Sequence, residues 1–193
     1  MAVRNIVFLG EQVLRQKAQK VQHVDKSIEK LIDDMVETMH AANGIGLAAN
    51  QVGVLQRVIV VELPLDEEDP QSGKLYTLIN PEVVSSSQDV ASGEEGCLSI
   101  PYYYGEVTRP QSVVVRGRDR KWREVKIKAS GMLARVFQHE IDHLNGILFI
   151  DRMTDMARLR YVPPKAETDE QTDAQTRTHE EAEAVKLPEL IAG

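Results

Sequence analysis

Residues 131–146 constrain this sequence more than any other segment, because they combine the pattern of a buried helix with two histidines. Apolar residues recur there at the spacing of an amphipathic helix and form one broad face: Met132, Leu133, Val136, Phe137, Ile141 and Leu144. Asn145-Gly146 follows, and glycine tolerates the left-handed backbone just past the end of a helix. The pattern therefore predicts a helix that is buried on this face and stops at Asn145.

The same helix carries His139, Glu140 and His143 in the pattern His-Glu-x-x-His. At about 3.6 residues per turn, positions four apart lie one above the other, so both imidazoles can bind one metal ion. Glu140 then lies close enough to act on water at that ion, which is the arrangement of metal-assisted hydrolysis. A pattern of three residues also arises by chance. Two hydrogen-bonded core histidines would produce it equally well, so the helix alone leaves both interpretations open.

Length and composition favour a single domain around this helix. The chain has 193 residues, of which 42% are hydrophobic, enough for one core. The apolar run at residues 6–9 is shorter than the apolar region of a signal peptide, and no segment is long enough to span a bilayer. Cys97 is the only cysteine, which excludes an internal disulfide and fits a reducing compartment. We therefore expect a cytoplasmic protein without a membrane partner.

The acidic residues are concentrated at the C-terminal end. Residues 163–193 hold eight Asp or Glu against three Lys or Arg, so only −2 of the net charge of −7 falls on residues 1–162. This segment begins with two prolines, has no aromatic residue and contains polar runs that bury too little apolar surface to offset the entropy of ordering. We predict a catalytic domain over residues 1–162 and a flexible acidic tail over residues 163–193. The chain has no concentrated basic stripe, so direct binding of nucleic acid is not expected.

The remaining helix and strand signals indicate the fold class. The segment from residue 28 to residue 39 has the spacing of an amphipathic helix, with Asp25 as its N-cap and Gly44 beyond its end. Strands are indicated at four segments rich in Val, Ile, Leu or Tyr, namely residues 57–63, 75–79, 112–116 and 124–128. Their charged and apolar residues alternate, which predicts sheets covered on one face. We expect an α+β fold with mostly antiparallel sheets packed around the helix that carries the two histidines.

Two glycine-containing segments have no simple structural explanation. Residues 44–51 read Gly-Ile-Gly-Leu-Ala-Ala-Asn-Gln, and such small residues permit close approach of another backbone. The segment lacks the Gly-Lys-Ser/Thr ending of a phosphate-binding loop. Residues 93–101 surround Cys97 with glycines and carboxylates, where a core cysteine would have apolar neighbours. An exposed or metal-binding thiolate fits this setting at least as well as a buried one.

Two histidines need a third protein ligand to form a tetrahedral site with one position open to water. Cys97 is an anionic candidate, because a bound ion deprotonates a coordinating thiol. Carboxylates downstream of His143, such as Asp151 and Asp155, are the alternatives, and they would fit a peptidase that cuts internal peptide bonds. A noncatalytic protein that binds ribosomes or nascent chains is a third possibility, although it would not need Glu140 as a general base.

Together these segments resemble the bacterial-type peptide deformylases. Three signatures of that family occur in order, at residues 44–51, at residues 95–99 (Glu-Gly-Cys-Leu-Ser) and at residues 138–143 (Gln-His-Glu-Ile-Asp-His). The resemblance extends from about residue 6 through residue 151. The family's usual proline in an early turn is absent or replaced by Gly10, a departure that concerns loop geometry.

The resemblance implies removal of the formyl group from the N-terminal formylmethionine of newly synthesised polypeptides, with release of formate. It implies that one divalent ion is held by Cys97, His139 and His143: ferrous iron in the cell, with zinc, nickel or cobalt possible in purified protein. By the same resemblance, the expected partners are N-formylmethionyl nascent peptides close to the ribosome. We expect the protein to be a monomer.

The resemblance also assigns catalytic roles. Glu140 would act as general base and general acid. The side-chain amide of Gln51 and the backbone N–H of Leu98 would stabilise the oxyanion. Gly46 would hold the peptide backbone of the substrate.

Residues on the histidine face of the helix are candidates for a methionine pocket. Val136 and Met132 lie one and two turns before His139, and together with Ile45 they would border the pocket. Arg135 either lays its stem along this wall or faces solvent, as a lone charge usually does. The run Tyr102-Tyr103-Tyr104 could stack beside the incoming peptide.

Further side chains would support the site. A histidine that binds a metal usually donates its other ring N–H to an acceptor, for which Gln138, Asp142 or a backbone carbonyl would serve. Glu95 and Arg109 could pair near the cysteine, either within the site or as an ordinary solvated ion pair.

Overall fold

The structure is a computed structural model that describes residues 2–164. Its α-helices are α1 (Lys26–Ala41) and α2 (Gly131–His143). Its strands are β1 (Gly46–Ala48), β2 (Val58–Glu62), β3 (Leu75–Ser86), β4 (Val90–Cys97), β5 (Ile100–Pro110), β6 (Ser112–Arg118), β7 (Glu124–Ser130) and β8 (Arg160–Tyr161). Short 3-10 turns occupy Gln12–Arg15, Ala49–Val52, Phe149–Arg152 and Met156–Arg158.

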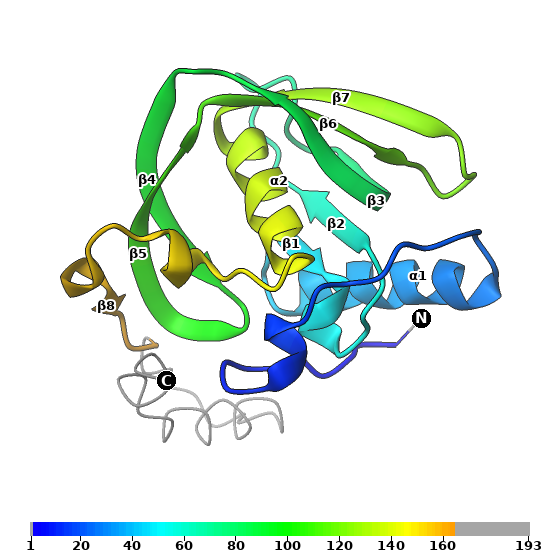
Figure 1. Cartoon of the computed structure of the whole chain (residues 1–193), viewed down its shortest axis with the longest axis horizontal. Coiled ribbons are helices and arrows are strands. Elements are labelled where there is room, and N and C mark those ends of the chain that lie inside the picture. Colours follow the sequence, from blue (N-terminus) through cyan, green and yellow to red (C-terminus); the bar gives the residue numbers. More distant parts are fainter. Residues whose placement is uncertain (1, 165–193) are drawn as a thin grey trace.

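The strands form two antiparallel sheets, one with the order β1-β2-β3-β6-β7 and the other with the order β4-β5-β8. Helix α2 lies in the middle of the molecule and contacts strands of both sheets (Figure 1). The predicted α+β fold, with antiparallel sheets around the helix that carries the two histidines, is therefore confirmed.

Helix α1 has the predicted start and the predicted buried face. The Asp25 side chain accepts hydrogen bonds from the backbone N–H groups of Ser27 and Ile28, which caps the first turn. Met35 and Met39 are completely buried in a cluster that includes residues of β2. They fill the core, as expected for flexible apolar side chains.

Helix α2 is buried through its apolar face. Leu133, Phe137 and Leu144 are fully buried in one core cluster, where the Phe137 ring contacts that of Tyr76 edge-on at 5.4 Å. After the helix ends, Gly146 has a φ of 76°, and a Cβ there would lie 2.4 Å from the carbonyl oxygen of Arg15. Only glycine fits both conditions, so the chain turns away where the sequence predicts.

The strands agree only in part with the prediction. The hairpin of β6 and β7 lies where expected, and β2 falls within the predicted segment. Strand β3 continues past Pro81 to Ser86, with a register shift between Ile79 and Glu82 that accommodates the proline. Strands β4 and β5 were not predicted. The glycine-containing segment around Cys97, where no strand was predicted, forms the end of β4 and the turn of their hairpin, a long curved ribbon (Figure 1).

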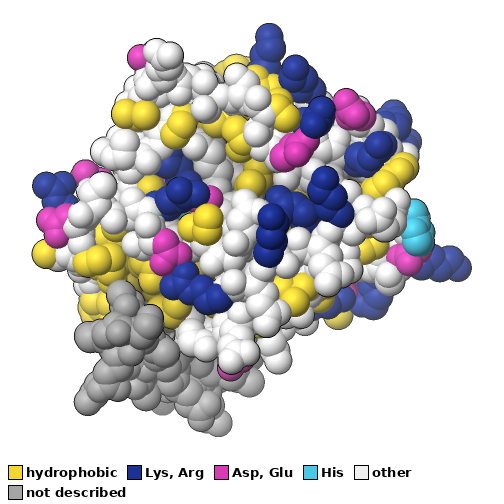
Figure 2. Space-filling view, in the orientation of Figure 1, with side chains coloured by type: hydrophobic (Ala, Val, Ile, Leu, Met, Phe, Trp, Pro, Cys, Tyr) yellow, Lys and Arg dark blue, Asp and Glu magenta, His cyan; other side chains and the backbone are white. Residues whose placement is uncertain are grey.

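No helix in the described part of the chain is long and apolar enough to cross a membrane. On the face shown in Figure 2, charged side chains of both signs are interspersed with small apolar patches. The acidic tail predicted for residues 163–193 lies outside the described residues, apart from Pro163 and Pro164.

Candidate active site

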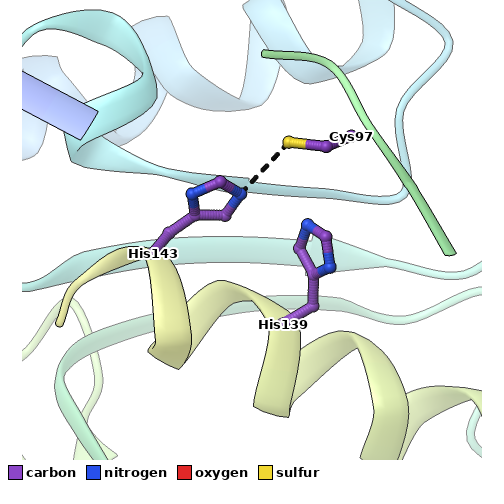
Figure 3. Close-up of side chains that lie close together, drawn as sticks. All are labelled: Cys97, His139 and His143. Carbon is purple, nitrogen blue, oxygen red and sulfur yellow. Dashed lines mark hydrogen bonds between the residues drawn. The ribbon is translucent and has the colours of Figure 1, made fainter. Parts of the chain in front are cut away.

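Three side chains from two elements meet beside α2. His139 and His143 come from the helix, and Cys97 is the last residue of β4 (Figure 3). One ligand atom from each lies within 4.8 Å of the other two. The Cys97 sulfur is 3.2 Å from Nε2 of His143, and the two imidazole centroids are 4.9 Å apart. The fold thus brings together the three residues that the sequence singles out as metal ligands.

The chemistry of this cluster suits a divalent transition metal, for which a thiolate and two imidazoles are good ligands. Nδ1 of His139 is 2.9 Å from a carboxylate oxygen of Glu95, which leaves Nε2 directed toward Cys97. Burial lowers the pKa of His143 well below its usual value, so this imidazole is neutral, as a metal ligand must be. The cluster contains no carboxylate among the described residues, and Asp151 instead accepts hydrogen bonds from Arg15 and the backbone of Leu148.

Glu95 connects the cluster of Cys97, His139 and His143 to two arginines. Its buried carboxylate accepts hydrogen bonds from Nε and Nη2 of Arg109 at 2.7 and 2.9 Å, and from Nη1 of Arg135 at 2.7 Å. Burial raises its pKa, but hydrogen bonds from His139 and Arg109 outweigh that effect and hold the pKa at about 2. Glu95 is therefore ionised and fixes the orientation of the His139 ring.

The predicted acceptors for His139 are wrong, because Glu95 takes this role. Gln138 donates its amide to the carbonyl oxygens of Pro110 and Ala134. Asp142 accepts hydrogen bonds from Arg109 and Arg152. The predicted pairing of Glu95 with Arg109 is confirmed, and the pair is buried within the site.

Arg135 lies inside the structure, contrary to the usual position of a lone charge. Only 12% of its side chain is exposed. Besides its ion pair with Glu95, it donates hydrogen bonds to the carbonyl oxygens of Ala91 and Val107 at 2.7 and 2.8 Å. The guanidinium also lies against Gly93, where a Cβ would be 3.0 Å from its carbon.

Glu140 lies on the same helix, buried and close to β1. One of its carboxylate oxygens has no hydrogen-bond partner, and burial raises its pKa to about 7. A Cβ at Gly46 would lie 2.4 Å from the other oxygen, so the strand passes this carboxylate only because Gly46 has no side chain. A buried carboxylate with a free oxygen and a pKa near neutrality suits general acid–base catalysis.

Gln51 and Leu98 lie close to the cysteine. The Gln51 oxygen accepts a hydrogen bond from the backbone N–H of Ala48 at 2.8 Å, which turns its amide nitrogen toward the Cys97 sulfur, 3.4 Å away. The same nitrogen is 3.2 Å from the hydroxyl of Ser99. Leu98 lies in the turn between β4 and β5.

A cavity of about 740 Å³ opens onto these groups. Its volume is within the range of ordinary small-molecule sites. It is lined by the candidates for catalysis and substrate binding: Ile45, Gly46, Gln51, Cys97, Leu98, Tyr102, Tyr103, Tyr104, Met132, Arg135, Val136, His139 and Glu140.

This chain is similar to known proteins in both sequence and fold. Residues 3–159 match the sequence model of the polypeptide deformylases. The chain belongs to this family. The peptide deformylase of Thermomicrobium roseum is 51% identical over 179 residues, which cover 92% of this chain and all of that protein.

Solved peptide deformylase structures superpose on the described fold. The enzyme of Ehrlichia chaffeensis in complex with actinonin has a TM-score of 0.76 at 45% identity, covering 82% of this chain and 92% of that one. The enzyme of Acinetobacter baumannii with bound Met-Ala-Ser has a TM-score of 0.74 at 36% identity, covering 79% of this chain and 99% of that one. The chain is thus a deformylase in sequence and in fold.

Proposed function

We propose that this chain removes the formyl group from N-formylmethionyl peptides with the residues of the cavity beside α2. Family membership supplies the reaction class, a metal-dependent hydrolysis that releases formate and a free amine. The single observation that carries the assignment of the site is the convergence of Cys97, His139 and His143 next to the buried carboxylate of Glu140.

The positions of the residues support the following roles. Cys97, His139 and His143 would hold a divalent ion, which when bound would lower the pKa of water and polarise the formyl oxygen. Glu140 takes a proton from the attacking water and passes it to the nitrogen of the methionine as the carbon–nitrogen bond breaks. The amide of Gln51 and the backbone N–H of Leu98 donate hydrogen bonds to the oxygen that gains negative charge.

The ligand class is a peptide that begins with methionine. The Acinetobacter baumannii relative binds Met-Ala-Ser, which supports the same class of ligand here. Ile45, Met132 and Val136 line the cavity and offer an apolar wall to the methionine side chain. Gly46 lies in β1, an edge strand of its sheet, and lines the same cavity, which supports its assignment to the peptide backbone of the substrate.

We further assign ferrous iron as the ion in the cell, with zinc, nickel or cobalt as substitutes in purified protein. A thiolate with two imidazoles accepts each of these metals. We place the enzyme in the cytoplasm as a monomer that acts on nascent peptides near the ribosome.

The test is formate release by metal-replete protein prepared without oxygen. Formyl-Met-Ala should yield formate, and the N-acetyl peptide should not. Absence of formate, or equal cleavage of both peptides, contradicts the proposal.

Two variants assign the roles. Glu140→Ala should keep its metal and lose at least roughly a hundredfold in rate. Cys97→Ala should lose the metal, as measured by metal analysis after dialysis. Retention of metal by Cys97→Ala would favour the peptidase alternative with a different third ligand.

A further inference from the structure

The pairing of β5 with β4 is interrupted beside Cys97. Gly96 pairs with Tyr104, but the next residue of β4, Cys97, pairs with Ile100. Residues 101–103 therefore form a bulge, a feature that often redirects side chains next to active sites. Within it, Tyr102 has a φ of 67°, in the left-handed region that is unfavourable for a bulky side chain.

Strand β8 pairs with β5 at this bulge, on the side of β5 opposite to β4. Tyr103 pairs with Tyr161, and the backbone N–H of Val162 donates a hydrogen bond to the carbonyl oxygen of Tyr102 at 2.8 Å. The Tyr161 ring contacts the Tyr102 ring edge-on, with centroids 6.3 Å apart. An unfavourable backbone conformation persists only where its surroundings impose it, and such positions cluster at ligand sites.

The bulge forms one wall of the catalytic cavity. Pro101, Tyr102, Tyr103 and Tyr104 all line it, whereas Met132 and Val136 line it from α2. A cavity of about 740 Å³ holds a ligand of drug size, which is more than one amino-acid residue. With methionine against α2, the tyrosine wall is one of the surfaces available to the residue that follows it.

We propose that Tyr102 is a specificity-determining residue that contacts the side chain of the second residue of the substrate and favours an aromatic one. This inference rests on the proposed function and narrows its substrate class. Aromatic rings attract one another in offset or edge-on arrangements. Glu94, which also lines the cavity, is paired with Arg160 of β8, so its charge is balanced.

The test compares kcat and KM for formyl-Met-Phe-Ser and formyl-Met-Gly-Ser. The wild-type enzyme should prefer the phenylalanine peptide in kcat/KM by roughly threefold to tenfold, the range of one aromatic contact. Tyr102→Gly removes the ring and tolerates the left-handed backbone, so it should bring this ratio close to one, mainly through KM.

Two substitutions at Val162 test the contribution of β8. Val162→Pro removes the N–H that bonds to Tyr102 and should lower the preference, whereas Val162→Ala keeps the N–H and should not change it. In the Tyr102→Gly background, Val162→Pro should have no further effect on the ratio.

The outcomes are distinguishable from a failure of the proposed function. If wild-type protein releases no formate from either peptide, the deformylase assignment itself fails. If Tyr102→Gly leaves the ratio unchanged, or weakens both peptides equally, the enzyme is a deformylase but Tyr102 does not select its substrate.

Discussion

Replacing Glu95 with glutamine tests whether one buried carboxylate stabilises both the fold and the metal site. The carboxylate is shared by Arg109, Arg135 and His139, and its side chain is 4% exposed. Glutamine keeps the shape but removes the charge, so two buried guanidinium groups lose part of their compensation. Removing one partner of a buried ion pair is strongly destabilising for this reason.

The size of the effect follows from the pKa of Glu95. A fall from the ordinary value of 4.5 to about 2 corresponds to about 3 kcal/mol of folding free energy. Because the pKa is lower in the folded state, this contribution is complete above about pH 4.5 and is lost as the pH falls toward about 2. The Glu95→Gln variant should therefore be less stable than wild type by about 3 kcal/mol near neutral pH, and by progressively less below about pH 4.5.

The assay is urea unfolding of metal-free protein at several pH values, since bound metal would add its own stabilisation. Glu94→Gln is the matched control, because Glu94 is one residue away and paired with Arg160 but has a side chain that is 54% exposed. A surface pair of this kind contributes about 1 kcal/mol at most. Equal losses in the two variants, or a Glu95→Gln loss that does not change with pH, would refute the reasoning.

Two further predictions concern the Glu140 carboxylate and the first helix. Gly46→Ala places a methyl group 2.4 Å from the Glu140 carboxylate, so kcat should fall roughly a hundredfold. Metal analysis should show an unchanged metal content. A normal kcat would mean that strand β1 can move away from Glu140. Asp25→Ala removes the cap of α1 and should lower the unfolding free energy by about 1 kcal/mol without changing kcat/KM. Ser27→Ala is the control for the cap, because this variant keeps the backbone N–H at position 27 that donates to Asp25.

The helices could be predicted from the sequence because their signals are local. The apolar spacing of α1, its Asp25 cap and the Gly146 stop after α2 each depend on residues within a few positions. Strands β4 and β5 could not be predicted in the same way. Strand β4 contains glycines and carboxylates, which are uncommon in strands, and its stability comes from the pairing of each of its residues with β5.

In the candidate site, too, the features that depend on local sequence could be predicted, and those that depend on long-range contacts could not. The two histidines are recognisable because helix geometry fixes their spacing, and the motif around Cys97 points to the third ligand. The surroundings of Arg135 are not local: Ala91 and Glu95, which bind it, lie 44 and 40 residues away in the sequence. No spacing rule connects such positions, so a lone arginine on a helix predicts a solvent-facing charge.

The three candidate metal ligands belong to a helix and a strand, α2 and β4, so the distances between them depend on tertiary contacts. Arg135 lies one turn before His139 on α2 and donates to carbonyl oxygens of both β4 and β5. Through Glu95 it is also joined to the imidazole of His139. The same set of contacts therefore fixes the hairpin that carries Cys97 and orients the ring that faces it. Removing this arginine from water costs desolvation, which its ion pair with Glu95 and its hydrogen bonds to the two strands offset, and these contacts preorganise the candidate ligands.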